Sequence, residues 1–338
     1  MRVVHTERHR LHRPSQFIKR GRPAPTPEVP ERGDAILASL RAAGHPVEEP
    51  PDLGLGPVRA VHSAGLIDFL ATGYARWREL PDAGEEMIPN VHPGPRFRTR
   101  PQSVVGQLGY HTSDSACPIG PGTWEAVLAV AHATAHAADI VMQGARASYA
   151  LCRPPGHHAA YDTAGGFCYL NNAAVAAQRL RGRFARVAVL DVDVHHGNGT
   201  QDIFWERPDV FFASIHGDPD GYYPFFSGYR HETGAGAGEG FTLNVPFPVG
   251  SGDAAVRAAA DEAIAGVRRF APEALVVSLG VDASEHDPHG GHAVTAAGFA
   301  AMAARVAALD LPTVLVQEGG YLCDALGPNV AGFLAAFG

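Results

Sequence analysis

RVAVLDVDVHHGNG, residues 186–199, joins an apolar run to two carboxylates and two imidazoles. The part from 186 to 194 has the apolar content and the length of a buried strand. Other short apolar runs follow, and helical patterns at about 254–269 and 295–309 separate the later ones. These runs are VFFASIH (210–216), FTLNVPF (241–247), ALVVSLGVD (274–282) and TVLVQEGG (313–320). Apolar strands that alternate with helices predict a parallel sheet with helices on both faces.

The chain before residue 186 fits the same α/β pattern. ASYALC (147–152) predicts a strand that runs into a loop, whereas the first 30 residues, with several prolines and cations, predict an extended segment. Apolar residues spaced three and four apart predict helices at 32–45, 64–79, 123–145 and 171–181. Since no internal repeat and no Pro/Ser-rich linker divides the chain, we predict one α/β domain over residues 1–338.

The least regular stretch lies at about 81–122 and is rich in Pro, Gly, Ser and Arg. A loop of this length inside a domain is usually functional or part of an interface. A disordered surface excursion is the alternative interpretation of the same composition.

Composition excludes several classes of protein. The chain has 338 residues, of which 46% are hydrophobic and 18% charged, with a net charge of −8, and its pI is about 6.1. This acidic net charge argues against a nucleic-acid-binding protein, which would need an excess of basic residues. No apolar run is long enough to span a membrane, and the charged beginning has no apolar core of a signal peptide, so we expect a cytoplasmic protein. The four cysteines form no CxxC pair, which favours reduced, buried thiols over a disulfide framework.

Carboxylates and an imidazole gather at predicted strand ends. Asp191, Asp193 and His195 alternate with other residues, so in an extended chain they share one face. Asp282 closes another apolar strand, and the carboxyl ends of parallel strands lie at one edge of a sheet. Asp193, His195 and Asp282 therefore form a plausible open zinc site. A DxH triplet alone is as easily a cap, a turn or a surface ion pair, but an Asp ending an apolar strand is costly unless it is ligated or hydrogen-bonded.

Two further elements supply proton-transfer groups. RPPGHH (153–158) places His157 and His158 side by side, and next to a metal they would supply the base and the acid that amide hydrolysis needs. By itself such a pair could equally be a ligand pair or a pH-sensitive surface feature. QEGGY (317–321) places Tyr321 on a glycine-rich loop, where its hydroxyl would stabilise an oxyanion or simply pack against the sheet.

Six motifs, in order over residues 153–321, resemble the histone deacetylase superfamily. They are RPPGHH (153–158), GGFCYLNNAAVAA (165–177), LDVDVHHGNGTQDIF (190–204), SIHGDP (214–219), SLGVD (278–282) and EGGY (318–321). The opening MRV, the irregular insert and the helix that begins at GTWEA (122–126) resemble the acetylpolyamine amidohydrolase branch of that superfamily. The resemblance implies the arginase/deacetylase fold, with a central parallel sheet of about eight strands flanked by helices.

The resemblance also implies roles for individual residues. Asp193, His195 and Asp282 match the family's ligands for zinc, which ferrous iron would replace in some cells. His158 matches the general base, and His157 lies near the leaving group with Asp191 holding its ring. The remaining matches are Asn198, where some members carry Asp as the partner of the second histidine, and Tyr321, which polarises the acetyl carbonyl.

Members of the family bind potassium and form a narrow substrate tunnel. One implied potassium site comprises Asp191, Asp193, His195, Ser214 and Ile215, partly through backbone carbonyls. A second would lie near Phe204, Arg207 and Val210. Phe167, with the adjacent Gly166, and Tyr223 match the tunnel walls, and two facing rings suit a thin methylene chain.

We therefore predict a zinc-dependent amidohydrolase that acts on an N-acetylated slender amine, most like an acetylpolyamine. In that branch the 81–122 insert lies at the active-site rim and mediates a homodimer. Asp114 is the candidate to attract a distal ammonium, whereas Glu85 and Glu86 are expected to be solvated. The insert and the first segment also carry cations, which a rim that binds a polycation would not be expected to have. An acetyl-lysine side chain, or an acetylated secondary-pathway intermediate, is therefore the alternative substrate. Those cations are Arg96, Arg98, Arg100, Lys19, Arg20 and Arg22.

Two other classes remain as alternatives. A binuclear manganese hydrolase of the arginase fold would need a second set of bridging ligands, which His196 and Asn198 do not supply. A non-catalytic binding protein would need a lost ligand or a lost Tyr321, and none is missing.

Overall fold

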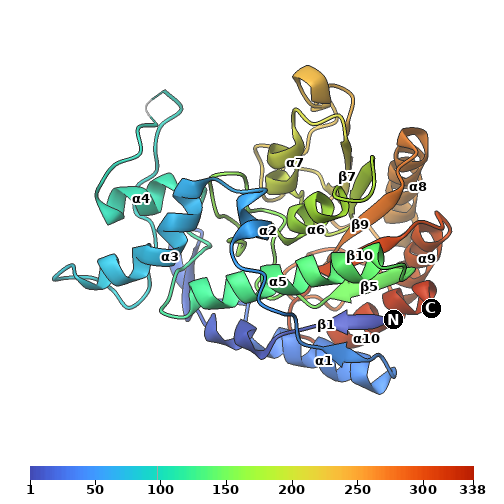
Figure 1. Ribbon diagram of the computed structural model, residues 1–338, viewed down its shortest axis with the longest axis horizontal. Coiled ribbons are helices and arrows are strands. Elements are labelled where there is room, and N and C mark those ends of the chain that lie inside the picture. The colour runs from blue at the N-terminus through green and yellow to red at the C-terminus, as the bar shows by residue number, and fades with distance from the viewer. Residues whose placement is uncertain (97) are drawn as a thin grey trace.

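The computed structural model describes residues 1–96 and 98–338 (Figure 1). Within them, eight strands form one sheet in the order β4-β1-β5-β10-β9-β6-β7-β8, and every pairing in it is parallel. The strands are β1 (Arg2–Val4), β4 (Val47–Glu48), β5 (Ala147–Ala150), β6 (Val187–Asp191), β7 (Val210–Gly217), β8 (Thr242–Phe247), β9 (Ala274–Leu279) and β10 (Thr313–Gln317). The prediction of one α/β domain around a parallel sheet of about eight strands is confirmed.

Helices cover both faces of this sheet, as Figure 1 shows. One layer contains α1 (Glu31–Ala42), α8 (Asp253–Phe270), α9 (Ala296–Ala307) and α10 (Leu326–Leu334). The other contains α2 (Gly56–Arg59), α3 (Ala64–Arg78), α5 (Thr123–Met142) and α6 (Asn172–Leu180). Successive residues of β6 divide between the layers: Val187 and Val189 belong to the core under α5 and α6, and Ala188 and Leu190 to the core under α8. This period of two buries the central strands on both sides.

All six predicted helices are present within three residues of their expected ends. The predicted strands are present too, but those that carry the polar residues end earlier than expected. β6 stops at Asp191, and although the Val192 N–H still donates to the Ser278 carbonyl of β9 (2.9 Å), the N–H groups after it find carboxylates. The N–H of Asp193 donates to Asp191 Oδ1 (3.1 Å), and the N–H of His195 donates to Asp193 Oδ1 (2.8 Å). The chain therefore turns at its functional residues.

The first 30 residues are more structured than the predicted extended segment. β1 lies inside the central sheet between β4 and β5, where Val3 and Val4 are completely buried. A short 3₁₀ helix, η1 (Glu7–Leu11), follows, and then an antiparallel hairpin of β2 (Gln16–Lys19) and β3 (Arg22–Pro25). A strand of three residues is too short to show a periodicity.

The insert at 81–122 packs on the core. It contains one helix, α4 (Val104–Tyr110), which the sequence pattern did not predict, and an antiparallel bridge between Met87 and Ile119. Met87, Leu108 and Ile119 are buried in the core shared with α3 and α5, which argues against a disordered excursion. Arg96 and Arg98 flank residue 97, which lies outside the described residues.

All four cysteines are unpaired, and three of them, Cys117, Cys152 and Cys168, are buried. In the part of the chain that the structure describes, none of the helices has the length and apolarity that crossing a membrane requires.

Candidate active site

The four central strands deliver the predicted functional residues to one edge of the sheet. β5, β10, β9 and β6 are consecutive neighbours, and each is followed at its carboxyl end by a polar segment. The segments carry His157 and His158 after β5, Tyr321 after β10, Asp282 after β9, and Asp193 and His195 after β6. The edge expected from the rule for parallel sheets is therefore where these side chains meet.

Asp193, His195 and Asp282 form a cluster suited to a metal ion. His195 Nδ1 lies 3.1 Å from Asp193 Oδ1 and 3.1 Å from Asp282 Oδ2. Ligands about 2.0–2.1 Å from a tetrahedral zinc ion lie roughly 3.3 Å from one another, so both distances from the imidazole nitrogen are close to what zinc requires. Both carboxylates are completely buried, and burial together with the charge of Asp193 raises the pKa of Asp282 to about 6. A divalent cation would relieve this repulsion.

Two glycines close the inner side of this cluster. A Cβ on Gly280 would collide with the Asp193 carboxylate, and one on Gly319 would collide with the carboxylates of both Asp193 and Asp282. The Gly319 N–H instead donates to Asp193 Oδ2 at 2.7 Å. The backbone thus holds the carboxylates in place and leaves room only for glycine.

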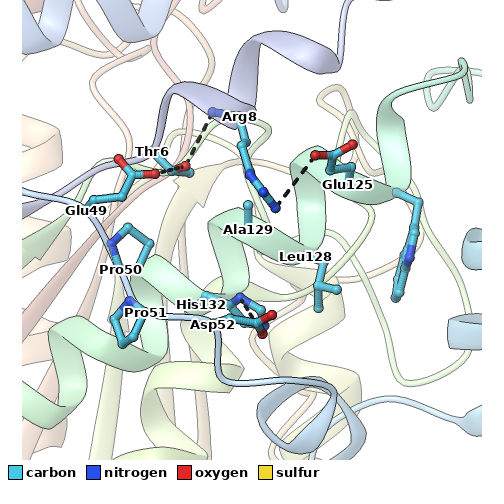
Figure 2. Close-up of a pocket in the computed structure, with 11 residues that line it drawn as sticks. Thr6, Arg8, Glu49, Pro50, Pro51, Asp52, Glu125, Leu128, Ala129 and His132 are labelled. Atoms are coloured by element: carbon cyan, nitrogen blue, oxygen red, sulfur yellow. Dashed lines mark hydrogen bonds and ion pairs between the residues drawn. The ribbon is translucent and has the colours of Figure 1, made fainter.

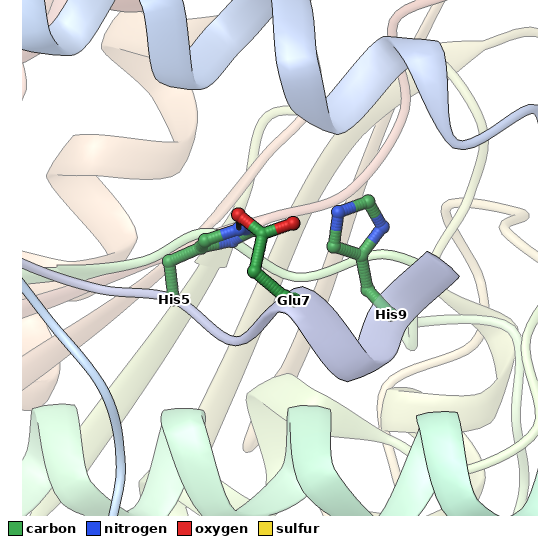
Figure 3. A group of neighbouring side chains, drawn as sticks. All are labelled: His5, Glu7 and His9. Atoms are coloured by element: carbon green, nitrogen blue, oxygen red, sulfur yellow. Dashed lines mark ion pairs between the residues drawn. The ribbon is translucent and has the colours of Figure 1, made fainter. Parts of the chain in front are cut away.

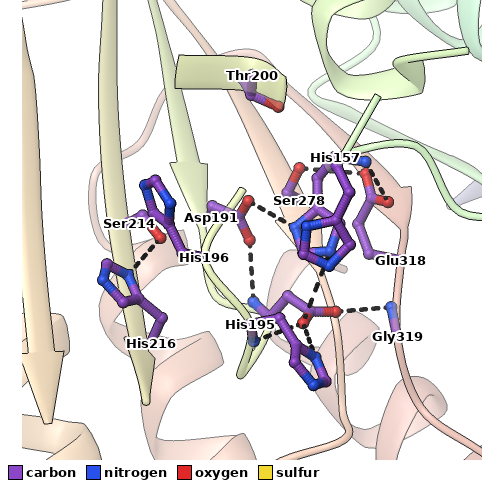
Figure 4. A network of polar contacts seen from close by, with 12 residues as sticks. His157, Asp191, His195, His196, Thr200, Ser214, His216, Ser278, Glu318 and Gly319 are labelled. Carbon is purple, nitrogen blue, oxygen red and sulfur yellow. Dashed lines mark hydrogen bonds and ion pairs between the residues drawn. The ribbon is translucent and has the colours of Figure 1, made fainter. Parts of the chain in front are cut away.

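His157 lies between two carboxylates, as Figure 4 shows for Asp191. Its Nδ1 is 3.0 Å from Asp191 Oδ2, and its Nε2 is 3.8 Å from Asp193 Oδ1. Burial by itself lowers the pKa of His157, but the charges of Asp193 and Asp191 outweigh it and raise that pKa to about 10. Asp191 thus occupies the position expected of the partner that orients this ring.

His158 has a neutral partner. Its Nδ1 donates to Asn198 Oδ1 at 2.7 Å, from the first residue of α7 (Asn198–Phe204). Burial first, and then the neighbouring His157 and His195, hold the pKa of His158 well below its ordinary value. The rings of His157 and His158 lie 4.0 Å apart, so two imidazoles with opposite pKa shifts sit side by side.

Glu318 is a site residue that sequence reasoning missed. Its carboxylate is completely buried and accepts hydrogen bonds from the backbone N–H groups of Gly156 (2.6 Å) and His157 (3.1 Å). Burial raises its pKa to about 7. Glu318 fixes the loop that carries the histidine pair. The sequence signal that could have identified it is its position directly after the apolar strand that precedes the QEGGY loop.

A cavity of about 230 Å³ leads to these residues. Its lining includes the predicted Gly166, Phe167, Tyr223, His158, His195 and Tyr321, and also Phe17, Lys19, Pro27, Ala116 and His289, which were not predicted to line it. Gly166 has a positive φ of 52°, and a Cβ there would collide with His158 and Tyr223. Tyr321 is nearly buried, and Arg32 of α1 lies over its ring at 5.1 Å.

Asp114 differs from its expected place. It does not line the cavity; its Oδ2 accepts from the Tyr223 hydroxyl (2.5 Å) and from the Gly166 N–H (3.1 Å). It therefore holds two of the walls from behind instead of presenting a free carboxylate. Glu86 is likewise engaged, by the Ser15 N–H, and Arg100 donates to His111 Nε2 at 2.9 Å.

The residues predicted for the first potassium site lie at the carboxyl end of β6, in the segment that follows it and on β7. Asp191 of β6 pairs in register with Ser214 of β7, and Ile215 follows it. Ser214 Oγ contacts His216 Nδ1 at 2.8 Å (Figure 4). At the other end of α7, the Arg207 N–H donates to the carbonyl of Phe204 at 3.0 Å, and Val210 begins β7.

Known proteins are similar to this chain in sequence. Residues 26–337 match the model of the histone deacetylase domain. The acetylpolyamine amidohydrolase of Burkholderia pseudomallei is 48% identical over 332 residues, covering 97% of this chain and 96% of that protein. The enzyme of the same name from Mycoplana ramosa is 43% identical, covering 99% and 98%.

The same fold is present in a solved structure. The crystal structure of the acetylpolyamine aminohydrolase from Burkholderia pseudomallei superposes with a TM-score of 0.97 at 47% identity, covering 100% of this chain and 98% of that one. Together with the family match, this superposition shows that the chain belongs to the histone deacetylase family.

Proposed function

We propose that this chain hydrolyses the acetyl amide of N-acetylated slender amines, above all acetylpolyamines, with a zinc ion held by Asp193, His195 and Asp282. One observation carries the proposal: the three-ligand cluster and His157 lie together beside a cavity whose lining includes His158, His195 and Tyr321. The relatives that match nearly the whole chain are named for the same activity.

When bound, zinc supplies a Lewis acid that polarises a carbonyl and acidifies water. His158 acts as the general base. Because its Nδ1 donates to Asn198, the neutral ring leaves Nε2 unprotonated and free to accept the proton of the attacking water. Its lowered pKa keeps the ring neutral at neutral pH.

His157 has the complementary role of holding a proton. Its raised pKa and its contact with Asp191 keep the ring protonated at neutral pH, so it stabilises negative charge near the leaving group. The amine nitrogen takes its proton from this histidine pair as the C–N bond breaks.

Tyr321 supplies the oxyanion donor. Its backbone N–H donates to Asp287 Oδ2 at 2.7 Å, and Phe167 lies against its ring with the centroids 6.2 Å apart. Burial raises the pKa of the phenol well above its ordinary value, so the hydroxyl keeps the proton that it donates to the acetyl oxygen.

The cavity selects substrates by the thickness of their carbon chain and by their charge. Phe167 and Tyr223 suit a methylene chain, whereas Lys19 is an exposed cation of the lining. This cation favours substrates with less positive charge far from the acetyl group. It supports acetyl-lysine side chains, or an acetylated secondary-pathway intermediate, as the second candidate substrate.

The remaining features complete the proposal. Potassium would bind near Asp191, Asp193, His195, Ser214 and Ile215, and ferrous iron would replace zinc in the cell under some conditions. The 81–122 insert would form the rim, to which it contributes Ala116, and the contact of a homodimer. The unpaired thiols favour the cytoplasm.

The test is a steady-state comparison of acetylputrescine, acetylcadaverine, acetylspermidine and an acetyl-lysine peptide. A higher kcat/KM for the free amines supports the polyamine assignment. A preference for the peptide refutes that assignment but leaves the deacetylase proposal in place, and no turnover of any of them by the zinc-loaded protein refutes both.

A further inference from the structure

A second group of potential ligands lies outside the active site. His5 follows β1 directly, and Glu7 and His9 belong to η1 (Figure 3). Each offers one ligand atom, and these atoms lie within 4.8 Å of one another. Nothing in the proposed reaction uses these residues.

The two imidazoles are buried without partners. His5 is 4% exposed and His9 is 1% exposed, yet none of their four ring nitrogens has a hydrogen-bond partner of normal geometry. Polar groups close to His5 include the Glu7 carboxylate, 3.6 Å from its Nε2, and the backbone of Leu151. Buried polar atoms without partners are rare, and each typically costs about 1–3 kcal/mol.

Local backbone structure places the three side chains together. Thr6 caps η1 by accepting the N–H of Arg8, which fixes the start of the short helix that carries Glu7 and His9. Thr6 and Arg8 point into a surface cavity lined also by Glu49 and Glu125 (Figure 2). His5, Glu7 and His9 are not part of that lining.

The neighbouring helix leaves room for the ring of His9. A Cβ on Gly33 of α1 would lie 3.0 Å from His9 Cε1, so the imidazole packs directly over a glycine. Glu7 is 62% exposed, which leaves the site open to solvent on its side. A small ion can therefore reach rings that are otherwise buried.

We propose that His5, Glu7 and His9 bind a second divalent transition-metal ion, of the class that prefers imidazole, such as zinc. Imidazole nitrogens and a carboxylate are common ligands of this class, and the exposed side leaves a position for water. Burial lowers the pKa of both histidines, that of His9 to about 3, so both rings are in the neutral form that donates a lone pair.

The surrounding charges are compatible with a cation. Arg10 lies close, but it donates to Glu7 Oε2 at 2.8 Å and also to Asp34. This bond leaves Glu7 Oε1, the oxygen nearer His5, for the ion. Arg153, whose charge also reaches His9, is paired with Glu28 at 2.9 Å.

A purely aromatic packing role for His5 and His9 does not explain their unpartnered ring nitrogens. The rings of His5 and His9 lie 5.1 Å apart and are tilted by 54°, a geometry that a pair of phenylalanines would also adopt. Phenylalanines would leave no nitrogen unsatisfied. The presence of two imidazoles beside a carboxylate is explained by a ligand that all three share.

The test is metal stoichiometry on the whole chain of residues 1–338 with its active-site metal in place. The protein is equilibrated with zinc, freed of loosely bound ions by gel filtration, and measured for zinc per chain. The wild type should hold one zinc more than His5→Phe, which keeps a buried ring of similar size. Deacetylase turnover should be equal in the two, since His5 lies outside the cavity.

Two further variants make the result specific. Glu7→Gln changes an exposed side chain, and it should weaken zinc retention even if His5→Phe folds poorly. Asp282→Asn should lose the active-site ion and keep the one at His5. Equal zinc content in the wild type, His5→Phe and Glu7→Gln would overturn the proposal, and so would a wild type whose only zinc disappears in Asp282→Asn.

Discussion

His158 donates its Nδ1 proton to the amide oxygen of Asn198, 2.7 Å away, and not to a carboxylate. An amide fixes the tautomer as a carboxylate would, but it adds no negative charge to stabilise the imidazolium. The partner therefore orients the proposed base and raises its pKa less than a carboxylate would.

Replacing that amide tests this assignment. Asn198→Asp should raise the pKa of His158 by about one unit, because a carboxylate within hydrogen-bonding distance favours the charged ring. The acidic limb of the kcat/KM profile against pH should then move to higher pH by the same amount. An unshifted limb in an active Asn198→Asp enzyme would show that another group is the base.

Tyr321→Phe tests the oxyanion donor. Removing one such donor typically costs about 3–4 kcal/mol of barrier, roughly 100- to 1,000-fold in kcat. Zinc content should not change, because the phenol is not among the ligand atoms of the cluster. Wild-type kcat in this variant would exclude the role.

Gly319→Ala tests the space around the carboxylates. The new methyl group would displace Asp193 and Asp282, so zinc affinity should fall by about 10- to 100-fold, as for other changes next to metal ligands. Gly332→Ala is the matched control, because a Cβ on that helical residue meets nothing within 4 Å. Competition with a chelating dye measures both affinities, and equal values would mean that the carboxylates tolerate the methyl group.

Lys19→Glu tests charge selection at the cavity. A unit charge about 4 Å from another contributes about 1 kcal/mol in water, or roughly fivefold in rate. The variant should gain kcat/KM for acetylspermidine, a dication, more than for acetylputrescine, and salt should reduce the gain. Arg22→Glu, on the same hairpin but outside the lining, is the control. Equal gains in kcat/KM for acetylspermidine in both variants would show that the location of Lys19 in the cavity lining does not determine the charge selection.

His62 makes stability depend on pH. It is buried, accepts the Asn171 N–H at Nε2 (2.8 Å) and donates from Nδ1 to the carbonyl of Ala160 (3.0 Å). Burial lowers its pKa to about 4, so the unfolded chain binds more protons between that value and about 6.5, and stability falls as pH drops through this window.

His62→Gln, which does not titrate there, removes this contribution. Between pH 7 and pH 5 the wild type should lose about 2 kcal/mol more of its free energy of unfolding than the variant. Urea titration at the two pH values measures the difference. Parallel losses would show that His62 does not carry this dependence.

Much of the fold and of the site follows from sequence, for identifiable reasons. The helices and central strands have clear periods, and Asp193, His195 and Asp282 follow apolar strands whose ends must share an edge. β1 was missed because three residues show no period. Arg32 was missed because an arginine in an amphipathic helix is expected in solvent, whereas here it donates to the carbonyl of Glu318 at 2.8 Å.

The place of Asp114 could not be predicted either. Its partners, Gly166 and Tyr223, come from segments 52 and 109 residues away, and no local pattern encodes that meeting. Lys19 and His289 reach the cavity in the same way, from a hairpin near one end of the chain and a loop near the other.

The separation of 87 residues between His195 and Asp282 also bears on how the protein matures. No short segment offers the proposed ion more than two of its three ligands, so the complete cluster exists only once β6 and β9 have paired. Capture of that ion would then be a late step that locks a finished sheet, in contrast to small zinc domains whose folding the ion initiates.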